Sequence, residues 1–180
     1  MYEVELKVRA EHDRVRPRLE SIGAEPAGTV SQVDTYYDHP VREFGETDEA
    51  LRVRRETDDE DGEGERAKVT YKGRLVDDGS KTREELETGV GDGDTMAGVL
   101  ESVGFEPAAT VEKRRERFRH GEYTVTLDTV EGLGEFVEVE TEAEAIDPAR
   151  EGAIEVLERL GLDPADGIRT SYLGLLLDGT

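Results

Sequence analysis

The sequence predicts an α+β protein built on a closed antiparallel barrel of eight strands, with helices packed outside. The first observation is the strict alternation in Glu3-Val4-Glu5-Leu6-Lys7, which puts charged side chains on one face of a strand and apolar ones on the other. The second is that most other predicted strands alternate in the same way. The third is an internal repeat, which indicates one domain over residues 1–180 with two related halves, about 1–90 and 91–180.

The first half of the chain is predicted to form one helix and five strands. Apolar residues at helical spacing predict a helix over residues 13–22, which Gly23 ends. A turn at His39-Pro40 and an acidic, glycine-containing loop over residues 57–65 separate strands. The predicted strands cover residues 1–7, 29–38, 50–56, 67–72 and 82–88.

The second half contains the internal repeat. Residues 100–111 match residues 19–30 at nine of twelve positions, at an offset of 81, and both segments contain a Gly-x-Glu-Pro turn. We expect a helix over residues 95–103, strands over 110–119, 123–130 and 135–141, and a third helix ending near Gly161. The final run, residues 172–177, should pack against the barrel as a strand or short helix.

Composition and charge restrict the function. The 180-residue chain has no cysteine, which excludes disulfides and thiolate metal sites. Its formal net charge of −22 repels nucleic acid and anionic membranes, and no apolar run could span a bilayer. We therefore expect a cytoplasmic protein that binds neither nucleic acid nor membrane. Five lysines beside eighteen arginines, on a strongly acidic chain, indicate a halophilic source; the alternative is an ordinary acidic protein.

The side chains opposite the Val and Leu positions form a mixed charged set. For any single strand, a solvated sheet face explains such alternation. Two features favour an inward-facing set instead: four of the five lysines lie in predicted strands, and basic residues recur at i and i+2. Closure into a barrel would turn this face into a polar tunnel. The set comprises Glu3, Glu5, Lys7, Arg52, Arg54, Lys72, Arg83, Glu85, Lys113, Arg115, Thr126, Asp128, Glu138 and Glu140.

Cations on some walls and paired carboxylates on others suit a polyphosphate chelated by a divalent metal. Cations alone would indicate a plain anion site, and carboxylates alone a calcium site. The sequence has no Gly-x-x-x-x-Gly-Lys-Ser/Thr loop, no Gly-x-Ser-x-Gly elbow and no His-Glu-x-x-His motif. Because converging cations repel one another in an empty tunnel, we expect alanine at Arg54 or Arg115 to leave the unliganded protein as stable or slightly more stable.

A series of short motifs stands in one order along nearly the whole chain. It begins with Glu-x-Glu-x-Lys at residues 3–7 and continues through Leu-Gly-Glu-Phe-Val-Glu-Val-Glu at residues 133–140. This series resembles the CYTH family of triphosphate tunnel metalloenzymes. Tyr-Lys-Gly at 71–73, Arg-Glu-Glu at 83–85 and Ser-Tyr at 171–172 resemble its class IV adenylyl cyclase branch, which makes cyclic AMP and pyrophosphate from ATP. Arg74 stands where that branch often has proline, which leaves base recognition open.

The resemblance implies in-line displacement at phosphorus with Mg²⁺ or Mn²⁺ as cofactor. It implies that the metals are bound by Glu3, Glu5, Asp128, Glu138 and Glu140, with Glu85 as a further ligand. It implies that the triphosphate is bound by Lys7, Arg52, Arg54, Lys72, Arg83, Lys113 and Arg115. The expected catalytic residues are Glu3, Glu5, Lys7, Asp128, Glu138 and Glu140.

Three functions stay open at this point. The first is a class IV-type adenylyl cyclase acting on ATP, and the second is a triphosphatase acting on tripolyphosphate or an organic triphosphate. The third is a polyphosphate-binding module without turnover. A homodimer is left open.

Several further residues are assigned by position alone. His12, His39 and His120 fall at helix starts or turns and are interpreted as solvated surface residues. Tyr36 and Tyr37 are interpreted as strand core rather than as groups that stack on a base. On the strand after Val111, Arg117 and Arg119 would extend the basic wall, whereas Arg114 should face away from it.

Overall fold

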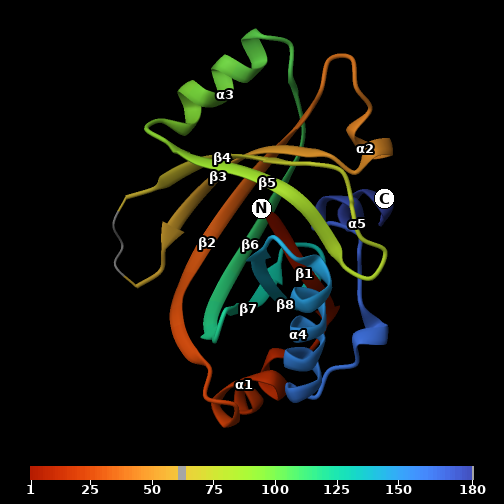
Figure 1. Cartoon of the computed structure of the whole chain (residues 1–180). Helices are drawn as coiled ribbons and strands as arrows, with labels where there is room; N and C mark the ends of the chain where they lie inside the picture. The colour runs from red at the N-terminus through yellow and green to blue at the C-terminus, as the bar shows by residue number, and fades with distance from the viewer. Residues whose placement is uncertain (61–63, 180) are drawn as a thin grey trace.

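The computed structural model describes residues 1–60 and 64–179 of the chain. Its antiparallel strands close into one barrel in the order β1-β5-β4-β3-β2-β6-β7-β8, and β8 pairs with β1 to complete the ring. The predicted fold class is therefore confirmed. The strands are β1 (Tyr2–Arg9), β2 (Glu25–Asp38), β3 (Ala50–Asp58), β4 (Arg66–Lys72), β5 (Lys81–Val90), β6 (Glu106–His120), β7 (Tyr123–Val130) and β8 (Gly134–Ala143), as Figure 1 shows.

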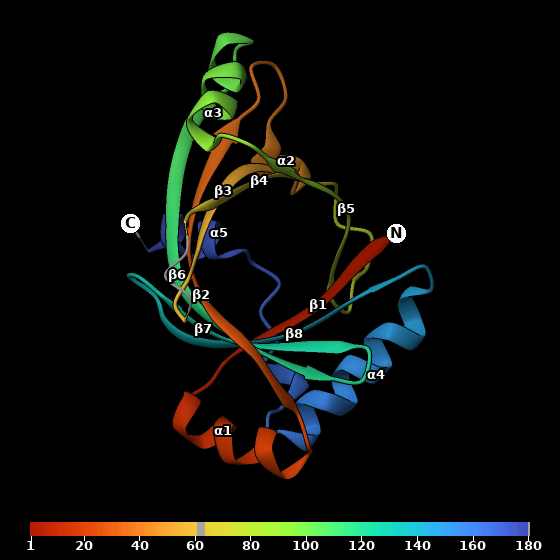
Figure 2. The same ribbon diagram turned by 90° about the vertical axis from the view of Figure 1, so that its left-hand side faces the viewer.

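In the described part of the chain, five α-helices lie outside the barrel. α1 (His12–Ser21) and α4 (Ile146–Arg159) lie on one side, and α3 (Gly93–Ser102) lies on the opposite side, as Figure 2 shows. The last run forms α5 (Tyr172–Asp178), which contacts β6. The short α2 (Phe44–Thr47) and the 3-10 turn η1 (Pro164–Asp166) were not predicted, since neither is long enough to show an apolar period. Within the described residues, no helix is long and apolar enough to cross a membrane.

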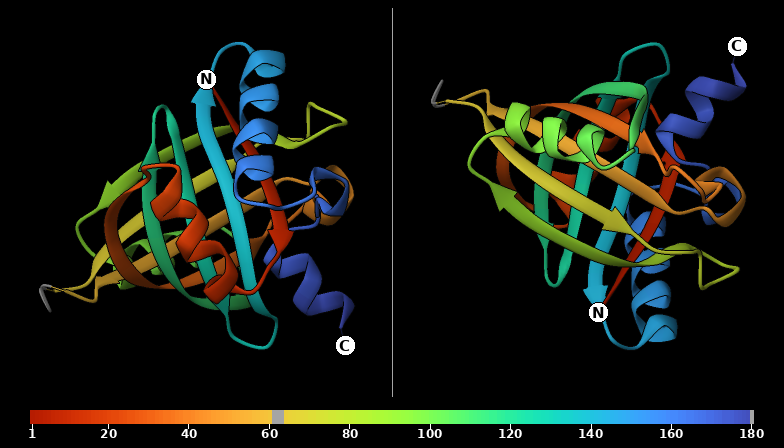
Figure 3. Two further views of the ribbon diagram at one scale, coloured as in Figure 1. Left: turned by 90° about the horizontal axis from the view of Figure 1, so that it is seen from below. Right: turned by 90° about the horizontal axis from the view of Figure 1, so that it is seen from above.

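The main hydrophobic core lies between the outer face of the barrel and helices α1 and α4. Leu6 and Val8 of β1 pack with Val15 of α1 and Leu157 of α4, and all four side chains are buried. Figure 3 shows both helices lying across the outer surface of the strands. Because the apolar faces point outward to these helices, the charged faces point inward. The alternative of a solvated charged face is therefore wrong.

The internal repeat has a clear counterpart in the fold. α1 and α3 begin and end 81 residues apart, which is the offset of the sequence repeat. Gln32 of β2 and Lys113 of β6 are also 81 residues apart, and they lie directly opposite each other in the antiparallel pair. An approximate two-fold axis that exchanges the halves therefore passes between these two residues.

The predicted boundaries were least accurate around the Gly-x-Glu-Pro segments. β2 begins at Glu25 and β6 at Glu106, so residues read as turns already belong to strands. A shift of register between Pro26 and Thr29 accommodates the proline, and Gly28 there has φ +94°. Such a bulge bends a long strand without ending it. The predicted loop over residues 57–65 includes residues 61–63, which lie outside the described part of the chain.

The interpretation of His12 as a solvated residue is wrong. Its side chain is buried, and its Nε2 lies 2.9 Å from the carbonyl oxygen of Phe136. Its backbone N–H donates to Glu135 Oε1 at 2.8 Å. His12 therefore ties the start of α1 to β8, a structural role that its position at a helix start does not reveal.

We expect Leu157→Ala to destabilise the protein by about 2–5 kcal/mol, because it leaves a cavity in the main core. The matched control is Leu86→Ala on the outer face of β5, where the side chain is 60% exposed and the change should cost about 0.5 kcal/mol or less. Denaturant unfolding at fixed high salt measures both. Equal losses in the two variants would contradict this assignment of the core.

Candidate active site

The inward face of the barrel encloses a cavity of about 590 Å³, here called the tunnel. Its walls carry eleven lysine and arginine side chains and eight glutamates, and they include all five lysines of the chain. The strict alternation of the strands explains this gathering, since one face holds every second residue. The tunnel lining contains twelve of the thirteen predicted site residues: Glu3, Glu5, Lys7, Arg52, Arg54, Lys72, Arg83, Glu85, Lys113, Arg115, Glu138 and Glu140.

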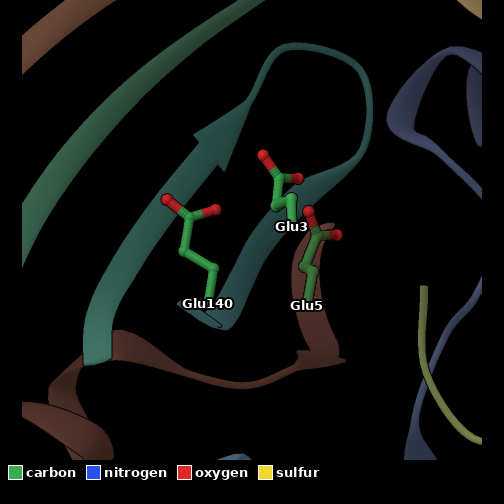
Figure 4. Close-up of side chains that lie close together, drawn as sticks. All are labelled: Glu3, Glu5 and Glu140. Atoms are coloured by element: carbon green, nitrogen blue, oxygen red, sulfur yellow. The ribbon is translucent and has the colours of Figure 1, made fainter. Parts of the chain in front are cut away.

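Three carboxylates form an acidic cluster on the wall made by β1 and β8. Oxygens of Glu3, Glu5 and Glu140 lie within 4.8 Å of one another, and Figure 4 shows the three side chains converging. Glu5 stands directly opposite Glu140 in the strand pair, so the register of β1 on β8 builds the cluster. A buried group of three carboxylates is stable only with compensating positive charge.

The ionisation of the cluster shows how incomplete that compensation is. Burial raises the pKa of Glu140 to about 8, and the neighbouring Glu3 adds to the effect. Burial and then the Glu138 carboxylate raise the pKa of Glu5. Burial also opposes ionisation of Glu3, but Lys72, which donates to its Oε1 at 2.5 Å, holds the pKa of Glu3 well below its usual range.

The donor set fits a hard divalent cation. Glu3, Glu5 and Glu140 offer only oxygen ligands, as Mg²⁺ and Mn²⁺ prefer, and within the described part of the chain Glu5 and Glu140 form no direct ion pair. Glu85 lies beside the cluster, with Oε2 3.3 Å from Lys72 Nζ, and burial raises its pKa to about 7. Glu138 is already engaged, because its Oε2 accepts a hydrogen bond from Arg115 at 2.8 Å.

Asp128 is the one predicted site residue outside the tunnel lining. It is completely buried, and Arg115 donates to both of its oxygens at 2.7 and 2.6 Å. The Tyr172 hydroxyl also donates to Oδ2, at 2.7 Å. Burial opposes ionisation, but the Arg115 charge lowers the pKa of Asp128 to about 2. Asp128 therefore holds Arg115 in place, and it is not one of the three carboxylates of the acidic cluster.

A second buried pair resembles the first across the approximate two-fold axis. Arg54 donates through two nitrogens to the two oxygens of Asp34 at 2.7 and 2.8 Å, and Asp34 is fully buried. Removing one partner of such a pair strands a buried charge, at a cost of about 3–5 kcal/mol. The expectation that alanine at Arg54 or Arg115 leaves the empty protein equally stable is therefore corrected: both changes should destabilise it.

Other cations in the tunnel are less compensated. Lys7 is 2% exposed and, among residues 1–60 and 64–179, forms no ion pair. Its Nζ lies 4.3 Å from the centroid of the Tyr172 ring, and Lys113 Nζ lies 5.2 Å from the same ring. Burial and then the Arg115 charge lower the pKa of Lys113 to about 7. Both lysines line the tunnel, and Lys113 Nζ also lies 3.5 Å from Asp34 Oδ2.

Several lining residues were missed or only noted at the sequence level. Lys81 lies one residue before the predicted strand over residues 82–88, so a longer strand would have included it. Glu87 lies within that predicted strand, on the same face as Arg83 and Glu85, but was not counted among the site residues. Arg117 and Arg119 do line the tunnel, as their spacing suggested, and Arg114 faces outward to Asp59. Tyr172 belongs to the Ser-Tyr motif at 171–172, but no strand alternation precedes α5 to indicate that its side chain reaches the tunnel.

The structure agrees with some of the remaining assignments from the sequence and differs from others. Tyr37 is core, as interpreted, whereas Tyr36 lines the tunnel and is not simply core. His39 and His120 are half-buried at turns, and none of the three histidines lines the tunnel. Thr126, a member of the predicted inward set, is fully buried but lies behind the tunnel lining.

Comparison with known proteins agrees with this site. The chain is similar to a Methanocaldococcus jannaschii protein named "Putative adenylate cyclase", with 37% identity over 179 residues that cover 97% of this chain and 98% of the relative. It is also similar to a solved Pyrococcus horikoshii protein, with a TM-score of 0.90, 37% identity and 99% of both chains covered. A Hippeastrum protein described as having a dominant triphosphatase activity shares the fold, at a TM-score of 0.70 and 16% identity over 99% of this chain and 96% of that one.

The CYTH domain matches residues 1–172, which is nearly the whole chain. That span contains every strand of the barrel, the acidic cluster and both buried arginine–aspartate pairs. The chain therefore belongs to the CYTH family, whose members are metal-dependent and bind triphosphate substrates.

Proposed function

We propose that this protein is a metal-dependent enzyme acting on a triphosphate, and specifically that it converts ATP into cyclic AMP and pyrophosphate. The observation that carries the proposal is the acidic cluster of Glu3, Glu5 and Glu140 facing buried lysines in one closed tunnel. A metal-chelated polyphosphate needs both kinds of group at close range. Neither the acidic cluster alone nor the cations alone would favour a metal-chelated polyphosphate as ligand.

The acidic residues would bind the metal, and the basic residues would bind the phosphates. Glu3, Glu5 and Glu140 would hold the metal, with Glu85 and Glu138 at the edge of the cluster. Mg²⁺ or Mn²⁺ there would lower the charge of the phosphates and the pKa of the attacking oxygen. Lys7, Arg52, Arg83 and Lys113 would bind phosphate oxygens, and Arg52 Nε supports this because it has no hydrogen-bond partner in the described part of the protein.

The two arginine–aspartate pairs would serve positioning. Asp34 and Asp128 fix the guanidinium planes of Arg54 and Arg115 along the tunnel wall. A fixed guanidinium binds phosphate without first losing side-chain freedom, and its charge neutralises the pyrophosphate that leaves. Tyr172 would hold Lys7 and Lys113 apart with its ring while bonding Asp128.

A triphosphatase is the second candidate. The same groups would serve water attacking the terminal phosphorus, and the Hippeastrum structural neighbour is described as having a dominant triphosphatase activity. The archaeal relative, which is similar along the whole chain, bears a cyclase name, and this favours the first candidate.

We expect purified protein incubated with ATP and Mg²⁺ or Mn²⁺ at high salt to release cyclic AMP and pyrophosphate in equal amounts. In a cyclase the ribose 3′-hydroxyl attacks the α-phosphorus, so pyrophosphate is the leaving group. Chromatographic separation of the products measures this. Orthophosphate with ADP would support the triphosphatase instead, and tight binding without any product would support a binding module.

We expect Glu140→Gln to reduce activity by at least about 100-fold, because it removes a metal-binding charge. The raised pKa of Glu140 means that, without metal, its ionisation destabilises the folded state as pH rises from about 4.5 to about 8. The unliganded mutant should therefore become increasingly more stable than wild type across that window. Melting curves from pH 5 to 8 in a chelator measure this difference.

Glu144→Gln is the matched control, since Glu144 is exposed just beyond β8. It should change neither activity nor the pH dependence of melting. Adding Mg²⁺ should stabilise wild type and the control but not Glu140→Gln. An equal Mg²⁺ shift in all three proteins would exclude Glu140 as a metal ligand.

We expect Arg83→Leu to remove most of the rise in melting temperature that tripolyphosphate and Mg²⁺ produce, while changing the unliganded melting temperature little. Arg83 is buried in the tunnel and, among residues 1–60 and 64–179, its side chain donates to the carbonyl oxygen of Asp48 and forms no ion pair, so its loss strands no carboxylate there. A tenfold weaker affinity corresponds to about 1.4 kcal/mol less ligand stabilisation.

Two other variants complete this melting experiment. Arg114→Leu, on the outer face of β6, should keep the full ligand shift. Arg115→Leu should melt lower even without ligand, because it strands Asp128. A full ligand shift in Arg83→Leu would mean that the triphosphate does not bind along this wall.

A further inference from the structure

A second cavity adjoins the tunnel. It has a volume of about 490 Å³ and lies between β2 and β3 on one side and helices α2 and α5 on the other. The two cavities share five lining residues: Tyr36, Arg52, Lys72, Arg83 and Ser171. Because Lys72 also donates to Glu3, this second cavity, here called the side pocket, opens beside the acidic cluster.

The side pocket differs in chemistry from the tunnel. Charged side chains dominate the tunnel walls, whereas the side pocket is lined largely by apolar groups, among them Phe44, Leu51, Leu75 and Leu173. A phosphate chain gains nothing from such walls. Their apolar surface and the cavity volume suit a flat organic group of nucleoside size.

One polar group in the side pocket has an unused acceptor. Glu49 is 6% exposed, and its Oε2 accepts hydrogen bonds from the Tyr71 hydroxyl at 2.6 Å and from Arg42. Its Oε1 is buried and has no hydrogen-bond partner among the residues described, with Arg74 Nε 3.8 Å away. A buried carboxylate oxygen without a donor is costly, and a ligand N–H would satisfy it.

We propose that the side pocket binds the base of a nucleoside triphosphate, and that Glu49 Oε1 accepts a hydrogen bond from an exocyclic amino group such as that of adenine. This rests on the proposed function, because the triphosphate of the same molecule would occupy the tunnel. It goes further by placing the base in the side pocket and by naming Glu49 as the residue that selects a base with an amino group. Arg74, whose position departs from the cyclase pattern, shares this carboxylate with the base.

The first test fills the side pocket. Gly45 of α2 lines it, and a Cβ added there would meet no atom within 4 Å, so the backbone leaves room for a larger side chain to start and Gly45→Trp should block the pocket. Gly98→Trp is the control, since Gly98 on α3 is equally open and lines neither cavity. Calorimetry with Mg²⁺ compares methylene-bridged tripolyphosphate with an ATP analogue that has a β,γ-methylene bridge and no 3′-hydroxyl, so that neither cyclisation nor terminal hydrolysis consumes it.

Gly45→Trp should bind the ATP analogue at least tenfold more weakly than wild type and the tripolyphosphate analogue within about twofold. Gly98→Trp should bind both as wild type does. Unchanged ATP-analogue affinity in folded Gly45→Trp would overturn the side-pocket proposal and leave the proposed function standing. A wild-type protein that binds neither compound would overturn both.

The second test probes Glu49 and does not depend on the tryptophan variant. Wild type should bind the ATP analogue at least tenfold more tightly than the matching inosine triphosphate analogue, whose base lacks the amino group. In Glu49→Gln, the donors Tyr71 and Arg42 keep the amide oxygen on the Oε2 side, so the amide NH₂ faces the base. The mutant should therefore prefer inosine. An absence of base preference in wild type, or an unchanged preference in the mutant, would overturn the proposal.

Discussion

Closure of the sheet between β1 and β8 gathers eight glutamates and eleven basic side chains around one cavity of about 590 Å³. On an open sheet these charges would be solvated and nearly independent. Inside the barrel they interact through a medium of low polarisability, so each ionisation depends on its neighbours. The raised pKa of Glu140 and the lowered pKa of Lys113 both follow from that confinement. A bound metal would therefore reduce the repulsion among the carboxylates, and a bound polyanion would reduce the repulsion among the cations.

The protein limits this electrostatic repulsion by holding some of the charges in ion pairs. Other charged groups are less compensated. Arg54 with Asp34 and Arg115 with Asp128 form buried bidentate pairs that stiffen the walls. Lys7, in contrast, rests only against the ring of Tyr172 among its described neighbours. The fixed pairs hold the shape of the walls, and on the proposed function the less compensated groups would add to the affinity for ligand. Stability and function thus depend on different members of the same charged face.

The sequence predicted the barrel and most of the tunnel lining because a strand has an exact period of two. From Glu3 and Glu5, the inward direction of Lys7 follows without further information. Pairing across strands does not follow in the same way. Asp128 has the right face and residue type for a metal ligand, yet its partner Arg115 lies on the neighbouring strand, and Tyr172 reaches it from α5. Those contacts depend on register and on the path of the C-terminal segment, which no local pattern encodes.

The position of β1 in the ring has a consequence for folding. The first strand of the chain lies between β5 and β8, so Glu5 pairs with Glu140, a residue 135 positions later. Contacts of such long sequence separation form late and slowly. During synthesis, therefore, the acidic cluster cannot assemble until β8 has emerged, and an incomplete chain exposes two open strand edges and no cluster. A divalent cation bound by Glu3, Glu5 and Glu140 would link β1 to β8, the last pair of strands to form.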